Sequence, residues 1–226
     1  MSQVDLLRKA PIFESLSDTE LQALAASLKQ RTFARGVVIF HKGSPGNSLY
    51  LIESGKVRIF ILSDSGQEIA INIHGPDECF GELALLDGLP RSASAVSLDR
   101  TTCYVLQRED FLATLETHPT MVRAILTLLS GRVRHATEYA ERLAFLDVQS
   151  RIASTLLALA DHYGIERQGI EIDLRLTQTD LASYVAASRE SVNKALGGLR
   201  DQGLVAIDGY TVTLIDPQGL RNLIQY

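Results

Sequence analysis

The segment FGELALLDGLPRSASA, residues 80–95, combines a carboxylate, a guanidinium group and several small residues. Glu82 and Arg91 are nine positions apart, and an Asp-Gly pair and Pro90 between them favour a turn. The chain can therefore double back and bring the two charged groups together. A carboxylate accepts hydrogen bonds from hydroxyl groups, and a guanidinium pairs strongly with anions. The segment therefore predicts a site for a ligand that has both hydroxyl groups and a negative charge.

Two other interpretations of the polar residues stay open. Glu82 and Arg91 are also able to form an internal ion pair that joins a loop to a helix. A metal site built on His41 and His74 would make the chain a metalloenzyme, but the five histidines are scattered and no HxH or HxxxH spacing occurs. Structural histidines are the simpler interpretation, and no paired-carboxylate or Ser-His-Asp pattern indicates an enzyme.

The elements that would position this segment are short strands. Between about residues 30 and 107, recurring glycines separate runs rich in Ile, Val, Leu and Tyr, such as SLYLIESGKVRIFIL, EIAINI and TTCYVL. Their regular spacing is typical of an antiparallel sandwich or jelly roll. Before them, Ser17 and two acidic residues precede LQALAASLKQ, which has helical spacing of apolar residues. We predict a short packing helix followed by a β jelly roll.

A long helix is predicted after His118-Pro119 because apolar residues recur every seven positions in two sets offset by four. The sets are Leu126, Val133 and Ala140, and Val122, Leu129, Ala136 and Leu143. This a/d pattern over about three heptads favours a coiled coil, and hence a dimerising helix. The alternative is a single helix lying across its own domain, because alanine at two positions makes the apolar stripe thin.

The last third of the chain has the pattern of a winged helix-turn-helix. Another helix, SRIASTLLALADHYG, precedes LTQTDLASYVAASRESVNKALGGLRDQGLV, in which Thr177 and Ser188 are each placed to cap a helix. On the second helix of this pair, apolar and polar residues occupy opposite faces. VAIDGYTVTLI then contains an Asp-Gly turn between two short strands.

Charge supports DNA binding only locally. The whole chain has a net charge of −5, whereas residues 186–200 contain three basic residues against one acidic residue. Arginine or lysine contacts guanine most often in the major groove, and a carboxylate such as Glu190 accepts from cytosine. The alternative for Arg189 and Glu190 is a solvated helix face.

Composition sets further limits. A chain of 226 residues with 46% hydrophobic residues fits two modest domains. No apolar stretch approaches the roughly 18 residues that span a bilayer, so we expect a cytoplasmic protein with no membrane partner. Cys79 and Cys103 are too few for a disulfide framework or a four-cysteine metal site, and we interpret both as small buried hydrophobic residues.

Several segments, taken together, resemble the cyclic AMP receptor protein and fumarate-nitrate regulator family of bacterial transcription factors. FGELALLDGLPRSASA resembles the family's phosphate-binding cassette, LAFLDVQSRIASTLLALA its hinge and next helix, and SRESVNKAL its recognition helix. PIFESLSDTEL and GNSLYLIESGKVRIF resemble its amino-terminal half. The resemblance covers nearly the whole chain.

The resemblance implies roles for individual residues. Glu82 would accept from the ribose 2′-hydroxyl and Arg91 would pair with the cyclic phosphate. The other implied ligand-binding residues are Gly81, Leu83, Ser92, Ala93, Arg132, Ala136 and Thr137. The implied DNA-binding residues are Thr177, Gln178, Ser188, Arg189, Glu190, Ser191, Asn193 and Lys194.

Departures from the family pattern bear on the effector. Ala136 and Thr137 stand where the archetypal receptor has a threonine and a serine that touch adenine, so one polar base contact is missing. No cysteine precedes Cys79, which excludes the oxygen-sensing branch and its iron–sulfur cluster. The carbon-monoxide-sensing branch holds haem near the cassette, but the intact FGEL and PRSA motifs favour a nucleotide. The alternatives are cyclic GMP, another nucleotide, haem, no ligand, or a regulatory module of a catalytic complex.

The predicted fold class is α+β, with three parts. Residues 1–117 form a cyclic-nucleotide-binding β-roll, residues 118–146 a dimerisation helix and hinge, and residues 147–226 a winged helix-turn-helix domain. The chain is expected to be a homodimeric transcription regulator rather than an enzyme, without a metal or a cofactor. Its predicted effector is cAMP and its predicted partners are palindromic double-stranded DNA with TGTGA-like half-sites and RNA polymerase.

Overall fold

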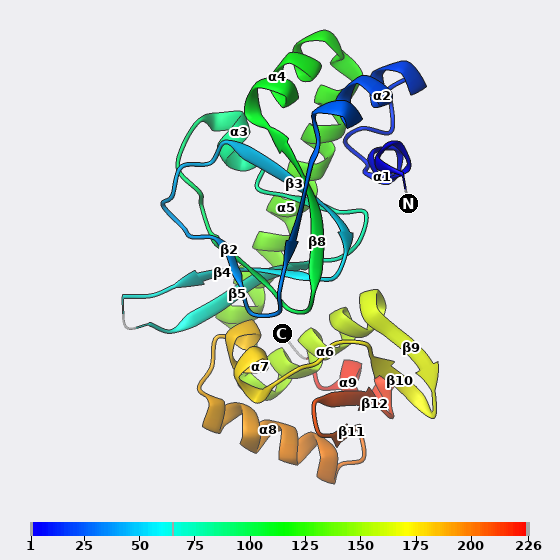
Figure 1. Cartoon of the computed structure of the whole chain (residues 1–226). Helices are drawn as coiled ribbons and strands as arrows, with labels where there is room; N and C mark the ends of the chain where they lie inside the picture. The colour runs from blue at the N-terminus through cyan, green and yellow to red at the C-terminus, as the bar shows by residue number, and fades with distance from the viewer. Residues whose placement is uncertain (1, 65, 225–226) are drawn as a thin grey trace. The chain divides into compact units, whose positions relative to one another are not determined.

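The computed structural model of the chain describes residues 2–64 and 66–224 (Figure 1). It divides into two compact units. The first comprises residues 1–61 and 70–134, and the second comprises residues 62–69 and 135–226. Each unit is described by itself.

The first unit contains the predicted β-roll. Its strands are β1 (Lys29–Phe33), β2 (Val38–Phe40), β3 (Ser48–Ser54), β4 (Val57–Leu62), β5 (Glu68–His74), β6 (Cys79–Phe80), β7 (Ser94–Ser97) and β8 (Thr101–Gln107), the ends of β4 and β5 extending past its boundary. Within the described residues they form one sheet in the order β1-β8-β3-β6 and another in the order β2-β7-β4-β5. β8 pairs antiparallel with both β1 and β3, and β7 with both β2 and β4. The prediction of an antiparallel roll is confirmed.

The first unit also contains helices. They are α1 (Gln3–Lys9), α2 (Asp18–Ser27), α3 (Leu83–Asp87), α4 (Arg108–Thr117) and the first part of α5 (Pro119–Phe145). The predicted helix after Ser17 is α2, which begins with a capping box in which Ser17 and Glu20 bond each other's backbone N–H. In Figure 1, α5 runs behind the strands.

Two clusters of buried side chains stabilise the first unit. Tyr50, Ile52, Val57, Phe80, Ala95, Cys103 and Val105 pack together inside the roll. A larger cluster joins α1, α2, α4 and the start of α5 to strands β3 and β8. Cys79 and Cys103 are both buried free thiols, and burial raises the pKa of each to about 12. Both therefore stay uncharged, as predicted for small buried hydrophobic residues.

The second unit contains the predicted winged helix-turn-helix. Its elements after α5 are α6 (Val148–Tyr163), β9 (Gly164–Arg167), β10 (Gly169–Ile172), α7 (Gln178–Val185), α8 (Arg189–Asp201), β11 (Val205–Asp208), β12 (Thr211–Leu214) and α9 (Pro217–Asn222). The four strands form a sheet in the order β11-β12-β10-β9. The β9–β10 hairpin lies outside the predicted elements, because β9 is a four-residue edge strand with every residue exposed and no apolar alternation to mark it.

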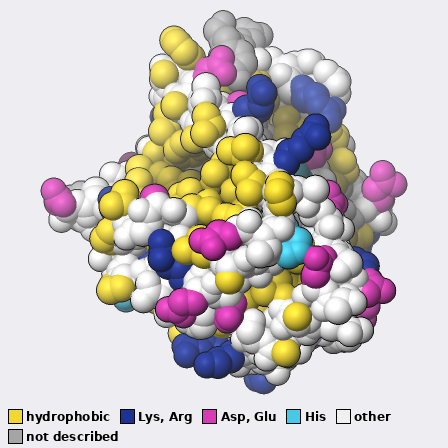
Figure 2. Space-filling model, turned by 90° about the horizontal axis from the view of Figure 1, so that it is seen from above, with side chains coloured by type: hydrophobic (Ala, Val, Ile, Leu, Met, Phe, Trp, Pro, Cys, Tyr) yellow, Lys and Arg dark blue, Asp and Glu magenta, His cyan; other side chains and the backbone are white. Residues whose placement is uncertain are grey.

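The long helix α5 confirms the prediction of a helix after Pro119, and its apolar residues divide into two groups. Val122, Leu126 and Val133 are 41%, 60% and 66% exposed. Leu129 instead packs, half-buried, against the core of its own unit. The predicted apolar stripe of α5 therefore lies partly against the core of its own unit and partly on the exposed surface. Figure 2 shows hydrophobic side chains gathered over a broad area of one face of the molecule.

None of the helices in the described part of the chain is long and apolar enough to cross a bilayer.

Candidate functional site

Arg91 is held in place by its own backbone before its side chain makes any contact. Its N–H donates to the carbonyl of Ser44 at 2.9 Å, and its carbonyl accepts from the N–H of Gly43 at 2.8 Å. The loop after β2 and the segment before β7 are therefore tied together at this residue. Although charged, Arg91 is only 5% exposed.

The guanidinium group of Arg91 lies between aromatic rings and backbone carbonyls. Nη1 donates to the carbonyl of Gly81 at 2.6 Å, and Nη2 donates to the carbonyl of Ser48 at 2.7 Å. The guanidinium carbon lies 4.2 Å from the centre of the Phe40 ring and 5.8 Å from that of Tyr50. These contacts fix the plane of the guanidinium and leave Nε buried without a partner among the described residues.

Gly81 is required by both its conformation and its neighbours. Its φ angle is +89°, a region that residues with a Cβ atom rarely adopt. A Cβ atom here would also lie 2.6 Å from Nη1 of Arg91 and 3.2 Å from the carbonyl oxygen of Ser48. The glycine before Glu82 therefore creates the space in which Arg91 reaches the backbone.

Glu82 precedes α3 and is 2% exposed. Its Oε1 accepts from Nη1 of Arg132, which is carried by α5. Nη2 of Arg132 also donates to the carbonyl of Cys79 at 3.1 Å, so the arginine is held at two points. The other carboxylate oxygen, Oε2, is buried and has no hydrogen-bond partner among the described residues.

The structure brings Arg91 to the residue before Glu82 but does not pair the two charged side chains. Arg91 bonds the residue directly before Glu82, and the negative charge of Glu82 acts on Arg91. The two side chains do not form an ion pair with each other within the described structure, because Glu82 takes Arg132 as its partner. We call the group formed by Gly81, Glu82, Arg91 and Arg132 the Glu82–Arg91 site.

Electrostatics of the Glu82–Arg91 site favour an anionic ligand. Burial lowers the pKa of Arg91, whereas nearby Tyr50 and Glu82 act to raise it. Arginine nevertheless stays protonated in proteins, so a buried positive charge with an unused N–H is present. Buried polar groups are normally satisfied, and an anion at Nε of Arg91 together with a hydroxyl donor at Oε2 of Glu82 would satisfy both.

The other predicted ligand-binding residues are more exposed. Leu83 and Ser92 are exposed and Ala93 is half-buried, and these three border the buried pair along the chain. Ala136 and Thr137 are exposed on α5, four and five residues after Arg132, in the part of the helix that belongs to the second unit.

Sequence reasoning missed the groups that orient Arg91. Ser48 acts through its backbone carbonyl, which leaves no mark on residue type. Phe40 and Tyr50 look like ordinary strand residues, and the ring of Tyr50 also stacks on Phe80 with centroids 5.0 Å apart. Only the pairing of distant strands brings these groups to one arginine.

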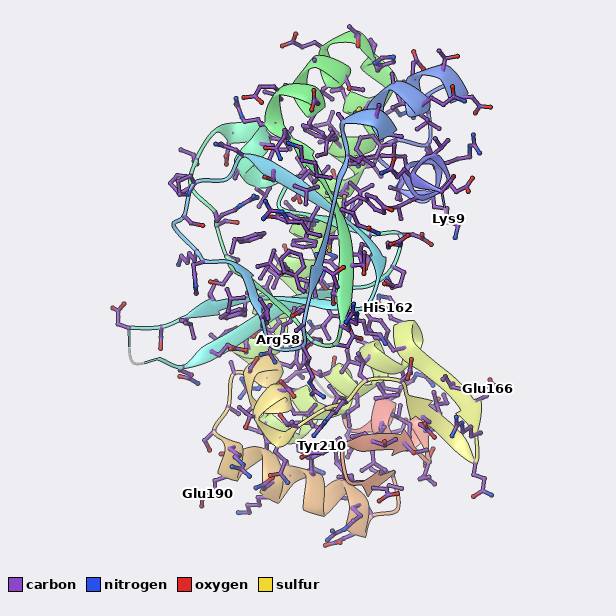
Figure 3. The ribbon with its side chains drawn as sticks, in the orientation of Figure 1. Lys9, Arg58, His162, Glu166, Glu190 and Tyr210 are labelled. Atoms are coloured by element: carbon purple, nitrogen blue, oxygen red, sulfur yellow. The ribbon has the colours of Figure 1, made fainter. Side chains whose placement is uncertain are left out.

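The predicted DNA-binding residues lie on and before α7 and α8. Thr177 caps α7 and Ser188 caps α8, as predicted. Val192, Leu196 and Leu199 form the buried face of α8. Arg189, Glu190, Asn193 and Lys194 are exposed on α8, Gln178 is exposed at the start of α7, and Ser191 is half-buried. Glu190, labelled in Figure 3, extends away from the unit at the start of α8.

Two exposed residues that contact each other near the start of α7 were not predicted. The guanidinium carbon of Arg175 lies 3.7 Å from the centre of the Tyr210 ring. The carbonyl of Tyr210 also accepts from the N–H of Leu176 at 3.0 Å, which ties the β11–β12 turn to the segment before α7. Both residues are exposed, and Tyr210 is labelled in Figure 3. They are 35 positions apart in the chain, so no local sequence motif predicts their contact.

No group of three or more metal-ligating side chains comes together in residues 2–64 and 66–224.

Comparison with known proteins matches two segments of the chain to described domain families. The family described as cyclic nucleotide-binding domain matches residues 30–118, and the family described as Crp-like helix-turn-helix domain matches residues 150–223. A CRP-like cAMP-activated global transcriptional regulator of Mycobacterium tuberculosis is 34% identical over 217 residues, which is 96% of this chain and 97% of that protein. The cyclic AMP receptor protein of Thermus thermophilus is 35% identical over 91% of this chain and 93% of that protein.

A solved structure supports the same placement. The c-di-GMP responsive global regulator CLP of Xanthomonas campestris has a TM-score of 0.78 and 29% identity, covering 88% of this chain and 99% of that chain. The fold and the site thus define a transcription regulator with a cyclic nucleotide-binding domain and a helix-turn-helix domain, not an enzyme. The chain belongs to the cyclic AMP receptor protein and fumarate-nitrate regulator family.

Proposed function

We propose that the effector of this regulator is cAMP, bound at the Glu82–Arg91 site. In this proposal Arg91 pairs with the cyclic phosphate, and Glu82 accepts a hydrogen bond from the ribose 2′-hydroxyl. Gly81, Leu83, Ser92 and Ala93 contribute close backbone approach and further donors, and Arg132 holds Glu82. Ala136 and Thr137 are assigned to the base.

One observation carries this proposal: the same buried site holds an unused donor and an unused acceptor. Nε of Arg91 and Oε2 of Glu82 are both buried without a partner in the described structure. A cyclic nucleotide supplies the matching pair, an anionic phosphate oxygen and a ribose hydroxyl. Two relatives with cAMP in their names, at 34% and 35% identity, support the choice of nucleotide.

Calorimetric titration of the whole chain with cAMP, cyclic GMP and cyclic di-GMP tests the effector. We expect cAMP to bind most tightly, and Glu82→Gln to weaken binding because the amide replaces one acceptor oxygen by a donor. Glu116→Gln is the matched control, since Glu116 is exposed on α4 and removing its charge leaves the site untouched. Absence of binding of any cyclic nucleotide to the wild type would refute the assignment.

The base contact has its own test. Ala136 has no hydrogen-bonding group, so selection between adenine and guanine rests on Thr137 and on shape. A hydrogen bond contributes about 0.5 to 1.5 kcal/mol, up to roughly tenfold in affinity. Ala136→Thr should therefore tighten cAMP binding by up to that factor and leave cyclic GMP nearly unchanged. Equal effects on both nucleotides would exclude a contact at the adenine edge.

We also propose that the chain acts as a parallel homodimer through α5. The exposed residues Val122, Leu126 and Val133 support this, because an apolar stripe on a helix is stabilised by burial against a second helix. Residues 1–117 are then assigned to effector binding, residues 118–146 to dimerisation and residues 147–226 to DNA binding. We place the protein in the cytoplasm, with RNA polymerase as a further partner.

The DNA site that we propose is a palindrome of TGTGA-like half-sites about 10 bp apart, one half-site for each recognition helix α8. The assigned contacts come from Thr177, Gln178, Ser188, Arg189, Glu190, Ser191, Asn193 and Lys194. Gel shifts should show that Arg189→Ala weakens binding by about 1 to 3 kcal/mol and relaxes the preference at one guanine. Arg200→Ala, at the other end of the same helix, is the control. Unchanged binding by Arg189→Ala would show that Arg189 does not contact a base.

The proposed switch has a thermodynamic requirement. A ligand shifts an equilibrium only by the difference between its affinities for the two states. We therefore expect cAMP to bind the DNA-bound dimer more tightly than the free dimer, by the same factor by which it tightens DNA binding. Calorimetry of cAMP with and without the palindrome measures this factor.

A further inference from the structure

His118 lies at the joint between two helices of the first unit. Its N–H donates to the carbonyl of Leu115 in the last turn of α4, and its carbonyl accepts from the N–H of Met121 in the first turn of α5. Pro119, the next residue, is the first residue of α5. The position of this ring therefore bears on where α5 begins.

Both nitrogen atoms of the His118 ring have close oxygen neighbours. Nδ1 lies 2.7 Å from the carbonyl oxygen of Thr114 and 2.8 Å from Oγ1 of Thr117, both on α4. Nε2 lies 2.5 Å from Oε1 of Glu20, which is carried by α2. The ring is 21% exposed and thus links α2, α4 and α5 at the edge of the core.

The partner at Nε2 is an ionised carboxylate. Oε2 of Glu20 accepts from the backbone N–H of Ser17 at 2.7 Å and from its hydroxyl at 2.6 Å. These bonds, with that from His118, lower the pKa of Glu20 to about 2. Glu20 therefore has no proton to donate at neutral pH, and His118 must donate at Nε2.

The nearest partner of Nδ1, the Thr114 carbonyl, is an acceptor as well, because a carbonyl oxygen has no proton. The Thr117 hydroxyl has a single proton, with acceptors in the carbonyls of Ala113 and Thr114, each at 3.1 Å, and in Nδ1 when the ring is neutral. A neutral imidazole carries only one N–H, so its other ring nitrogen presents a lone pair to the neighbouring oxygen atoms. Only the imidazolium form donates on both sides.

We infer that His118 is the protonated, doubly donating form that joins α2 and α4 to the start of α5, and that loss of its proton loosens this joint. Deprotonation sets a bare ring nitrogen against either the Glu20 carboxylate or the Thr114 carbonyl, so one of the two links must break. This gives the chain a pH-sensitive joint at the helix that carries Arg132.

Glu20 is the charged group that governs this titration. Its hydrogen bond, followed by that of Thr114, raises the pKa of His118, and burial opposes the shift. Along the chain the nearest charges are Glu116 on α4 and Arg123 on α5, and neither forms an ion pair with His118 in the described structure.

The sign of the pH dependence follows from the two shifts. The pKa of His118 is raised above 6.5, so its contribution to stability is complete below that pH and disappears as the pH rises through the raised value. The pKa of Glu20 is lowered from 4.5 to about 2, so its contribution is complete above 4.5 and disappears only in strong acid. The joint is therefore complete between about pH 4.5 and 6.5 and loosens above this range.

An NMR titration of the wild-type chain tests the inference without a destabilising variant. The His118 signal, identified by its loss in His118→Gln, should titrate above 6.5 and move down towards that value in Glu20→Gln. The glutamine is still able to cap α2 through Ser17. Glu116→Gln removes the same charge two residues from His118 and should leave the titration unchanged.

Amide hydrogen exchange, corrected for intrinsic pH dependence, provides the structural measurement. The first turn of α5, including Met121, should lose protection as the pH rises from 6 to 8.5 in the wild type and in Glu116→Gln. In His118→Gln the protection should not vary with pH. A His118 titration at or below 6.5, or the same pH profile of protection in His118→Gln as in the wild type, would overturn the inference.

Discussion

Removing the side chain of Arg91 should destabilise the first unit even when no ligand is present. Arg91→Leu deletes two guanidinium hydrogen bonds and leaves the carbonyls of Gly81 and Ser48 without those donors. Hydrogen bonds to a charged group contribute about 1.5 to 3 kcal/mol each, which gives a loss of roughly 3 to 6 kcal/mol. Leucine packed on Phe40 recovers about 1.5 to 3 kcal/mol. We expect a net loss of about 1.5 to 3 kcal/mol.

Urea denaturation of the ligand-free protein measures this loss, with hydrogen exchange in β3 and β8 reporting on the first unit. Arg100→Leu is the matched control, because Arg100 is exposed and follows the same strand, β7. Arg91→Lys should be intermediate, since it keeps the charge without the planar fork. If Arg91→Leu and Arg100→Leu unfold at the same urea concentration as the wild type, the contacts of Arg91 are not stabilising.

Four further outcomes are expected. Leu126→Asp, at a position 60% exposed in one chain, should give monomers by light scattering because a dimer would bury two unpaired carboxylates, whereas Thr127→Asp beside it should leave dimers. Gly197→Ala should raise the free energy of unfolding by about 0.5 to 1 kcal/mol in urea, since a Cβ in the middle of α8 meets nothing within 4 Å. Gly164→Ala should instead lower it, because its Cβ would lie 2.3 Å from a backbone carbonyl of α6. Arg175→Ala should weaken DNA binding equally for all sequences and reduce the salt dependence by about one phosphate contact; sequence-dependent weakening would mean that Arg175 contacts a base.

Patterns that depend on neighbours along the chain were predicted correctly. The helix that begins after Ser17, the caps at Thr177 and Ser188 and the buried face of α8 all follow from spacings of three or four residues. The β9–β10 hairpin lacked such a pattern, because exposed edge strands need not alternate. The apolar stripe of α5 was predicted from the sequence. The spacing of its residues did not show that Leu129 packs against the core of its own unit while Leu126 does not.

The two kinds of domain, the order of their elements and the residue types of the Glu82–Arg91 site could be predicted from the sequence, because periodicity, capping and turn formation are local properties. The partners of these residues depend on how distant elements pack in the fold. The fold pairs Glu82 with Arg132, directs Arg91 to the carbonyls of Ser48 and Gly81, and brings Glu20 to His118 across 98 positions of the chain. Such pairs form where strands and helices distant in sequence pack together, and a backbone carbonyl, which every residue carries, leaves no trace in the sequence that would show which one an arginine will find.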